Sequence, residues 1–120
     1  MADTRSWGTY LTEISKTNRP AAMNRDDVIE LLKGHEPEFR NAGVGALFLF
    51  GSVAQGEAGE TSDVDLFFDL KNVRGFTLFD LAGLQQRMQE ILGAKVDLMT
   101  RHGIHPRRRP RIEDSAVRVF

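Results

Sequence analysis

Apolar positions recur at helical spacing at the start of the segment 24–120. Asn24 followed by Asp27 is typical of a helix N-cap with an acid in the first turn. The stripe that this helix is expected to bury consists of Val28, Leu31 and Leu32. Pro37 is expected to kink or restart the helix, because its ring does not fit a helix interior, and Gly43 is expected to cap the end.

Three strands are predicted from two further patterns. The run 46–50 is continuously apolar and stops at a glycine, which is typical of a strand buried on both faces. From 63 to 70 apolar and polar positions alternate, which predicts a strand with one apolar face. Residues 95–99 alternate in the same way, with Asp97 turned away from the core. The segment 54–62 is rich in Gly, Glu and Ser and is expected to be a loop.

A capping box of Thr77 and Asp80 predicts a second long helix, which Gly93 ends. Its expected buried positions are Leu81, Leu84, Met88 and Ile91. One of the prolines in the arginine-rich tail is expected to start a last helix that runs through Ala116 and Val117. The predicted elements therefore follow one another as helix, strand, strand, helix, strand and helix.

Residues 1–23 form an N-terminal extension that is polar apart from one stripe at helical spacing. The stripe consists of Trp7, Tyr10, Leu11 and Ile14. Three interpretations remain open: a helix packed on its own domain, a helix that docks on a partner or a second copy, and a disordered segment.

Composition narrows the class of protein. A chain of 120 residues allows one domain of ordinary size. Sixteen basic and seventeen acidic residues give a net charge of -1, which excludes a protein that binds nucleic acid through a broadly basic surface. The absence of cysteine excludes disulfides, thiolate zinc sites and cysteine nucleophiles. No apolar run approaches the roughly 18 residues of a membrane span, and the N-terminus lacks a signal-peptide pattern, so we expect a cytoplasmic protein without membrane contact.

The candidate chemistry lies on the second and third predicted strands. Asp63 and Asp65 are two positions apart, so both carboxylates project from one face, about 7 Å apart. Asp97 is offered by another strand. Three carboxylates brought together repel one another, and a hard divalent cation compensates for the repulsion. Oxygen ligands favour Mg²⁺ or Mn²⁺ over Zn²⁺.

A candidate phosphate site precedes these acids. Gly51 allows the backbone to approach a ligand closely, and the Ser52 hydroxyl with nearby backbone N–H groups can bind phosphate oxygens. Gly51-Ser52 and Asp63-x-Asp65 are separated by ten residues, with Asp97 on a later strand. Each feature alone is common, but the combination at this spacing is specific.

This pattern resembles the minimal nucleotidyltransferase (MNT) domain of the DNA polymerase beta-like superfamily. The motif runs Gly-Ser-Val-Ala-Gln-Gly-Glu-Ala-Gly-Glu-Thr-Ser-Asp-Val-Asp-Leu from Gly51 to Leu66. The resemblance covers residues 24–120 and implies an α+β fold, a small mixed β-sheet with helices packed on one face. It implies that Asp63, Asp65 and Asp97 are catalytic and bind two Mg²⁺ ions, or Mn²⁺. It also implies that Gly51 and Ser52 bind the triphosphate of ATP.

The resemblance also implies a function and a partner. Stand-alone MNT domains of this size look like antitoxins that transfer AMP from ATP to a tyrosine of a HEPN ribonuclease toxin. A second hypothesis is a non-catalytic antitoxin that neutralises its partner by forming a complex. A third is a nucleotidyltransferase for small molecules, which the small size argues against. Assembly with a second copy or with the partner remains open.

One position departs from the family pattern, which often has a basic residue where this chain has Gln55. A neutral amide lacks a charge that would help to bind the triphosphate. Arg101 or the cluster Arg107–Arg111 are the candidate replacements. Nucleic-acid contact by this cluster is not expected, because it has no interleaved aromatic residues. Four other polar residues are expected to be bystanders: Asp69, Lys95, His102 and His105.

Overall fold

A mixed four-stranded β-sheet with strand order β3-β2-β1-β4 forms the centre of the protein. The computed structural model describes residues 24–57 and 63–120. The strands are β1 (Val44–Phe50), β2 (Val64–Leu70), β3 (Val96–Thr100) and β4 (Val117–Arg118). β1 pairs antiparallel with β2 and β4, whereas β2 and β3 run parallel. The predicted α+β class with a small mixed sheet is confirmed.

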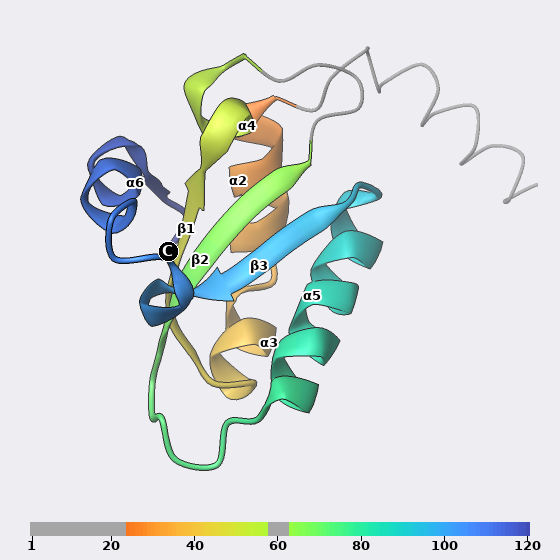
Figure 1. Cartoon of the computed structure of the whole chain (residues 1–120). Coiled ribbons are helices and arrows are strands. Elements are labelled where there is room, and N and C mark those ends of the chain that lie inside the picture. Colours follow the sequence, from red (N-terminus) through yellow and green to blue (C-terminus); the bar gives the residue numbers. More distant parts are fainter. Residues whose placement is uncertain (1–23, 58–62) are drawn as a thin grey trace, which may run out of the picture.

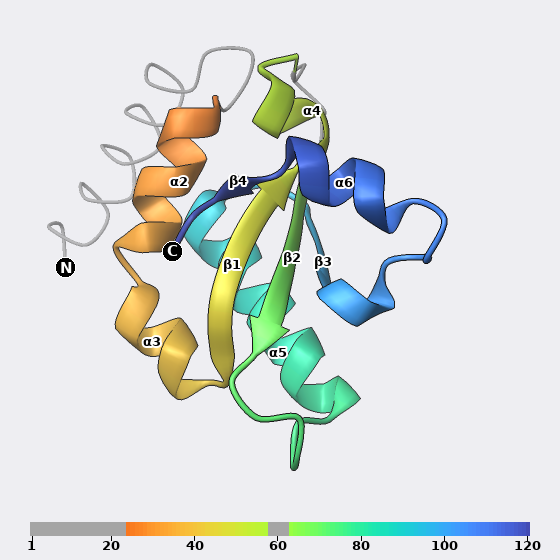
Figure 2. The ribbon, with the colours of Figure 1, turned by 90° about the vertical axis from the view of Figure 1, so that its left-hand side faces the viewer.

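Three helices cover one face of this sheet, as Figure 1 shows: α2 (Arg25–Lys33), α3 (Glu36–Asn41) and α5 (Leu78–Leu92). Three short helical elements complete the described residues: α4 (Gly51–Gln55), the 3₁₀ helix η1 (Arg101–Gly103) and α6 (Arg109–Ser115). In Figure 2, α6 lies on the side of β1 and β2 opposite to α2 and α3. Helices on the first face therefore form the main layer, and the C-terminal segment adds a partial cover on the second.

The main core lies between the sheet and the three longer helices. Val28 and Leu32 of α2 are fully buried there, as predicted, whereas Leu31 is 41% exposed and the prediction for it is wrong. At nine residues, α2 presents only a narrow stripe to the sheet, and Leu31 falls beside it. In α5, Leu84 and Met88 are buried, while Leu81 and Ile91 pack at the edge of the core.

A smaller core occupies the second face of the sheet. It contains Phe50, Phe67 and Ile104, packed against Phe48 of β1 and Ile112 of α6. The continuous apolar run of β1 is explained by this arrangement, because alternate residues enter the two cores. The prediction of a strand buried on both faces is confirmed.

Several predicted element boundaries are confirmed in atomic detail. The Asn24 side chain accepts from the Asp27 amide at 2.8 Å. Thr77 and Asp80 form the expected capping box, and Gly93 ends α5 with a φ of 64°. The first helix stops at Lys33 and restarts as α3, whose first turn contains the proline.

Two predictions about local structure are wrong. The chain does not enter a loop at Ala54, because α4 continues to Gln55 and buries Val53 and Ala54 in the main core. The last helix does not run through Val117 but ends at Ser115, after which β4 pairs with β1. In both places a tertiary contact decides the local conformation: burial under the sheet in one case and strand pairing in the other.

Two expectations concern residues outside the described ones. The first is the helical stripe predicted within residues 1–23. The second is the predicted loop 54–62, most of which lies outside the described residues. Among residues 24–57 and 63–120, no helix is long and apolar enough to cross a membrane.

Candidate active site

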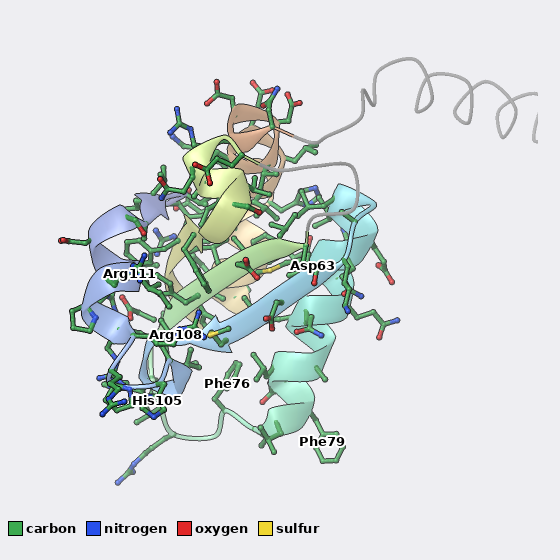
Figure 3. All side chains as sticks on the ribbon, turned by 45° about the horizontal axis from the view of Figure 1, so that its top comes forward. Asp63, Phe76, Phe79, His105, Arg108 and Arg111 are labelled. Carbon is green, nitrogen blue, oxygen red and sulfur yellow. The ribbon has the colours of Figure 1, made fainter. Side chains whose placement is uncertain are left out.

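Asp65 and Asp97 lie beside each other on parallel strands. The register of β2 and β3 pairs their Cα atoms directly. Val64 and Leu66 flank Asp65, and Val96 and Leu98 flank Asp97; all four apolar residues enter the core under the helices. Because side chains alternate along a strand, both carboxylates point to the second face of the sheet. Asp63 immediately precedes β2 and is partly exposed; Figure 3 labels it at the start of that strand.

The turn that contains Gly51 and Ser52 lies against the same carboxylate. Phe50, the last residue of β1, pairs with Asp65, so the chain enters α4 beside it. Gly51 has a φ of 79°, and a Cβ built on it would overlap Oδ2 of Asp65 and lie 3.1 Å from its Cγ. Glycine alone combines this backbone conformation with this close approach. Within the described residues the half-buried Ser52 hydroxyl has no hydrogen-bond partner.

The surroundings of Asp65 disfavour its charged form. Partial burial raises the pKa of the Asp65 carboxyl above its usual value, and the charges of Asp97 and Asp63 raise it further. The Arg108 guanidinium acts in the opposite direction. Asp63 and Asp97 are therefore both within electrostatic reach of Asp65, and a bound cation would relieve the repulsion.

The donor set fits a hard divalent cation bound by few protein ligands. In the part of the chain that the structure describes, no three His, Cys, Asp or Glu side chains gather closely enough to hold an ion. Asp63 turns partly to solvent, with Oδ2 4.0 Å from Nζ of Lys95. Asp65 and Asp97 remain as an adjacent pair of oxygen donors. Mg²⁺ commonly takes one or two carboxylates and completes its shell with water and phosphate.

Arg101 forms a polar network on this face. Its guanidinium donates to both carboxylate oxygens of Asp69, at 2.7 and 3.0 Å, and to Glu113 at 2.7 Å. It also lies 4.9 Å from the ring centroids of Phe48 and Phe67. These hydrogen bonds raise the pKa of Arg101 above its already high value. That Arg101 supplies a charge to a triphosphate stays a prediction, since three hydrogen bonds already engage the side chain in linking β2 to α6.

Sequence reasoning missed this network, because it depends on a strand register that the sequence pattern does not specify. The parallel register pairs Phe68 with Thr100, which brings the next two residues, Asp69 and Arg101, together. The expectation that Asp69 is a hydrogen-bonded residue rather than a metal ligand agrees with its pairing to Arg101. His102 is exposed, consistent with a bystander.

A separate surface hollow of about 650 Å³ lies at the other end of the sheet. It is bordered by α3, by the segment after β2 and by the first half of α5, and its lining includes Gly43, Lys71 and Phe79. Gly43 and Lys71 flank the pair Val44 and Leu70, whereas Asp65 pairs with the opposite end of β1. The hollow is therefore remote from the carboxylates.

Comparison with known proteins assigns the fold and the site pattern to one family. Residues 27–119 match the family described as nucleotidyltransferase domain. The chain belongs to this nucleotidyltransferase family. The Methanocaldococcus jannaschii protein MJ0435, provisionally named a protein adenylyltransferase, is 40% identical over 78 residues, 65% of this chain and 82% of that protein. Protein adenylyltransferase MntA of Thermococcus cleftensis is 31% identical over 85 residues, 70% of this chain and 84% of that protein.

Solved nucleotidyltransferase structures share the architecture. One provisionally described as a minimal nucleotidyltransferase has a TM-score of 0.69 and 31% identity, covering 82% of this chain and 98% of that one. A toxin-antitoxin with AMP-PNP has a TM-score of 0.60 at 20% identity, covering 82% and 73%. A tri-AMPylated Shewanella oneidensis HEPN toxin in complex with MNT antitoxin gives 0.56 at 15%, covering 77% and 71%. The last two show likeness of fold alone, and the predicted membership of the minimal nucleotidyltransferases is confirmed.

Proposed function

We propose that this nucleotidyltransferase is an Mg²⁺-dependent antitoxin that transfers AMP from ATP to a tyrosine hydroxyl of a cognate HEPN ribonuclease toxin. The observation that carries the proposal is the pairing of Asp65 with Asp97 on adjacent strands, with the Gly51 backbone against Asp65. Relatives named protein adenylyltransferases support the transfer of AMP to a protein. A fold neighbour that contains a tri-AMPylated HEPN toxin and an MNT antitoxin supports the choice of partner.

Each residue of the site has a role in this proposal. Asp65 and Asp97 bind the metal, and Asp63 becomes a third ligand when its side chain turns from Lys95 towards them. Two ions or Mn²⁺ would suit the same oxygen donors. The metal would supply positive charge to the phosphates. The backbone of Gly51 and the hydroxyl of Ser52 bind phosphate oxygens of ATP.

The proposed reaction exchanges one phosphorus–oxygen bond for another. The tyrosine oxygen bonds to the α-phosphorus of ATP, and the bond from that phosphorus to the pyrophosphate oxygen breaks. Pyrophosphate leaves with the electron pair. Asp97, the more exposed member of the carboxylate pair, accepts the proton of the attacking hydroxyl.

One observation favours a second candidate, an antitoxin that neutralises its partner by binding alone. The helix α4, which begins with Gly51 and Ser52, contains no basic residue and ends at the exposed Gln55. A weak nucleotide site would leave complex formation as the remaining means of neutralisation. The two candidates differ in whether the partner is chemically modified.

The test is the intact mass of the HEPN partner after coexpression with this chain. The double variant Asp63→Asn/Asp65→Asn removes two proposed ligands with little change in side-chain shape. The matched control is Asp26→Asn, which neutralises an exposed carboxylate on α2, a helix that covers the opposite face of the sheet. We expect AMP-sized mass increments with the wild type and the control but not with the double variant. A partner that stays unmodified in a stable wild-type complex would instead support the binding-only candidate.

A further inference from the structure

The strand that carries Asp97 lies at the edge of the described sheet. β3 comes first in the strand order β3-β2-β1-β4 and has five residues. Alternate amides of an edge strand face away from the neighbouring strand and need other hydrogen-bond partners. A slip of β3 by one residue would turn Asp97 from the second face of the sheet towards the main core. The position of Asp97 therefore depends on what holds β3 in register.

Two glutamines of α5 bind the backbone on either side of Asp97. The Val96 amide donates to Oε1 of Gln89 at 3.0 Å, and the Leu98 amide donates to Oε1 of Gln85 at 3.2 Å. Both glutamines are partly buried, and the side chains of Val96 and Leu98 are buried in the main core. Asp97 is thus the residue between two amides that α5 holds.

The spacing of the two glutamines matches the spacing of the two amides. Residues four apart on a helix lie on one face, about 6 Å apart along the helix axis. Residues two apart on a strand also lie on one side, about 6.6 Å apart. In Figure 1, α5 lies along β3, and Gln85 and Gln89 reach Leu98 and Val96 in opposite chain order. Two hydrogen bonds at this spacing fix the position of β3 along α5, which a single bond would not do.

We propose that Gln85 and Gln89 are positioning residues for Asp97, because they hold β3 in the register that places Asp97 beside Asp65. They act through the backbone of β3 and touch neither metal nor nucleotide. The inference rests on the proposed function in taking Asp97 as a metal ligand, whereas the role of the glutamines in the register is independent of it. Both residues lie outside the motif of Gly-Ser and Asp-x-Asp.

The first test is amide hydrogen exchange, followed by NMR in the full chain without metal. The Val64 amide at the start of β2 donates at 2.9 Å to the carbonyl that precedes β3, so its exchange reports on the pairing of the two strands. The double variant Gln85→Met/Gln89→Met removes both acceptors and keeps the length of the side chains. Exchange at Val64 should become faster by about tenfold or more, because two amides of buried residues lose their acceptors.

Two comparisons separate a local role from a general one. Exchange at Leu47, whose amide in β1 donates to the C-terminal carbonyl at 3.1 Å, should change by less than about twofold in the double variant. Gln86→Met, which replaces an exposed glutamine of the same helix, is the matched control and should leave both amides unchanged. Gln85→Glu/Gln89→Glu keeps an oxygen acceptor at both positions and should hold Val64 within about threefold of the wild type.

The second test measures the dissociation constant of Mn²⁺, used alone as the probe. It should rise by about tenfold or more in the double methionine variant, because β3 shifts to expose its unpaired amides to water and moves Asp97 away from Asp65. It should stay unchanged in Gln86→Met. Thermal melts without metal should show that each variant folds.

The outcomes distinguish this inference from the proposed function. Equal increases of exchange at Val64 and Leu47 would overturn the inference, since the glutamines would then support overall stability alone. Faster exchange at Val64 with an unchanged Mn²⁺ dissociation constant would overturn it as well. If the wild type binds no Mn²⁺, the proposed metal site falls, and exchange at Val64 relative to Leu47 decides whether the glutamines hold the register. If Mn²⁺ binding depends on the glutamines but the HEPN partner is never modified, the inference stands and the proposed transfer reaction falls.

Discussion

Replacing Gly51 by alanine tests the contact on which the candidate site depends. The backbone there has a φ of 79°, and a left-handed conformation costs an L-residue about 1–2 kcal/mol. The smaller entropy of the unfolded alanine chain returns about 0.4–1 kcal/mol. The new Cβ would also overlap Oδ2 of Asp65 and lie 3.3 Å from its Cβ, an overpacking that typically costs about 1–3 kcal/mol. Gly51→Ala should therefore lower the free energy of unfolding by about 2–4 kcal/mol.

Gly75→Ala is the matched control for this substitution. Gly75 has the same φ of 79°, but a Cβ there meets nothing within 4 Å. The control should thus show only the backbone cost, about 1 kcal/mol or less. Urea unfolding of both variants gives the difference, which we assign to the contact with Asp65. In thermal melts, about 2 kcal/mol corresponds to roughly 8–16 °C for a domain of this size.

The same melts test the functional side of the contact. Asp65 can avoid the new methyl group only by rotating away or by moving with its strand. Either shift displaces a proposed metal ligand, so Mg-ATP should raise the melting temperature of Gly75→Ala but not that of Gly51→Ala. Equal losses of stability in the two variants, together with equal stabilisation by Mg-ATP, would refute the contact and the role derived from it.

Three further substitutions have predictable outcomes. Asp65→Asn should stabilise the metal-free protein at neutral pH, because the raised pKa means that the Asp65 charge destabilises the folded state there. This gain should shrink as the pH falls towards 3.8, the ordinary value for the carboxyl, and a pH series of urea unfolding in EDTA would detect a gain that fails to shrink. Arg101→Lys should lose about 1–3 kcal/mol in urea unfolding, because lysine cannot form the paired hydrogen bonds to Asp69; a loss below about 0.5 kcal/mol would contradict this. Phe120→Ala should cost about 3 kcal/mol, since the ring is buried and stacks on Phe39; a loss below about 1 kcal/mol would contradict that packing.

Periodic elements could be predicted from the sequence because local rules determine them. The alternation around Asp65 and the capping box of Thr77 each depend on residues that are close together in the sequence. The side of the sheet occupied by Asp65 and Asp97 follows from the same alternation. What brings them side by side is the parallel register of β2 and β3, which the sequence pattern alone does not specify.

Features that depend on distant contacts could not be predicted in this way. β4 has only two residues, and its strand character comes from pairing with Phe48 and Leu49 of β1. Local propensity cannot indicate so short a strand. The hydrogen bonds of Arg101 likewise require two strands in register and a helix that brings Glu113 close.

One face of the sheet carries most of the hydrophobic core, and the other carries the candidate acids. The face under α2, α3 and α5 buries the larger core and carries none of the candidate acids. The second face carries Asp65 and Asp97 and has a small core of its own, centred on Phe50 and Phe67, against which α6 packs through Ile112. Substitutions in the larger core should therefore lower stability without altering the arrangement of Asp65 and Asp97. Gly51 is where the two requirements meet, because its backbone conformation serves the turn into α4 and its missing side chain makes room for Asp65.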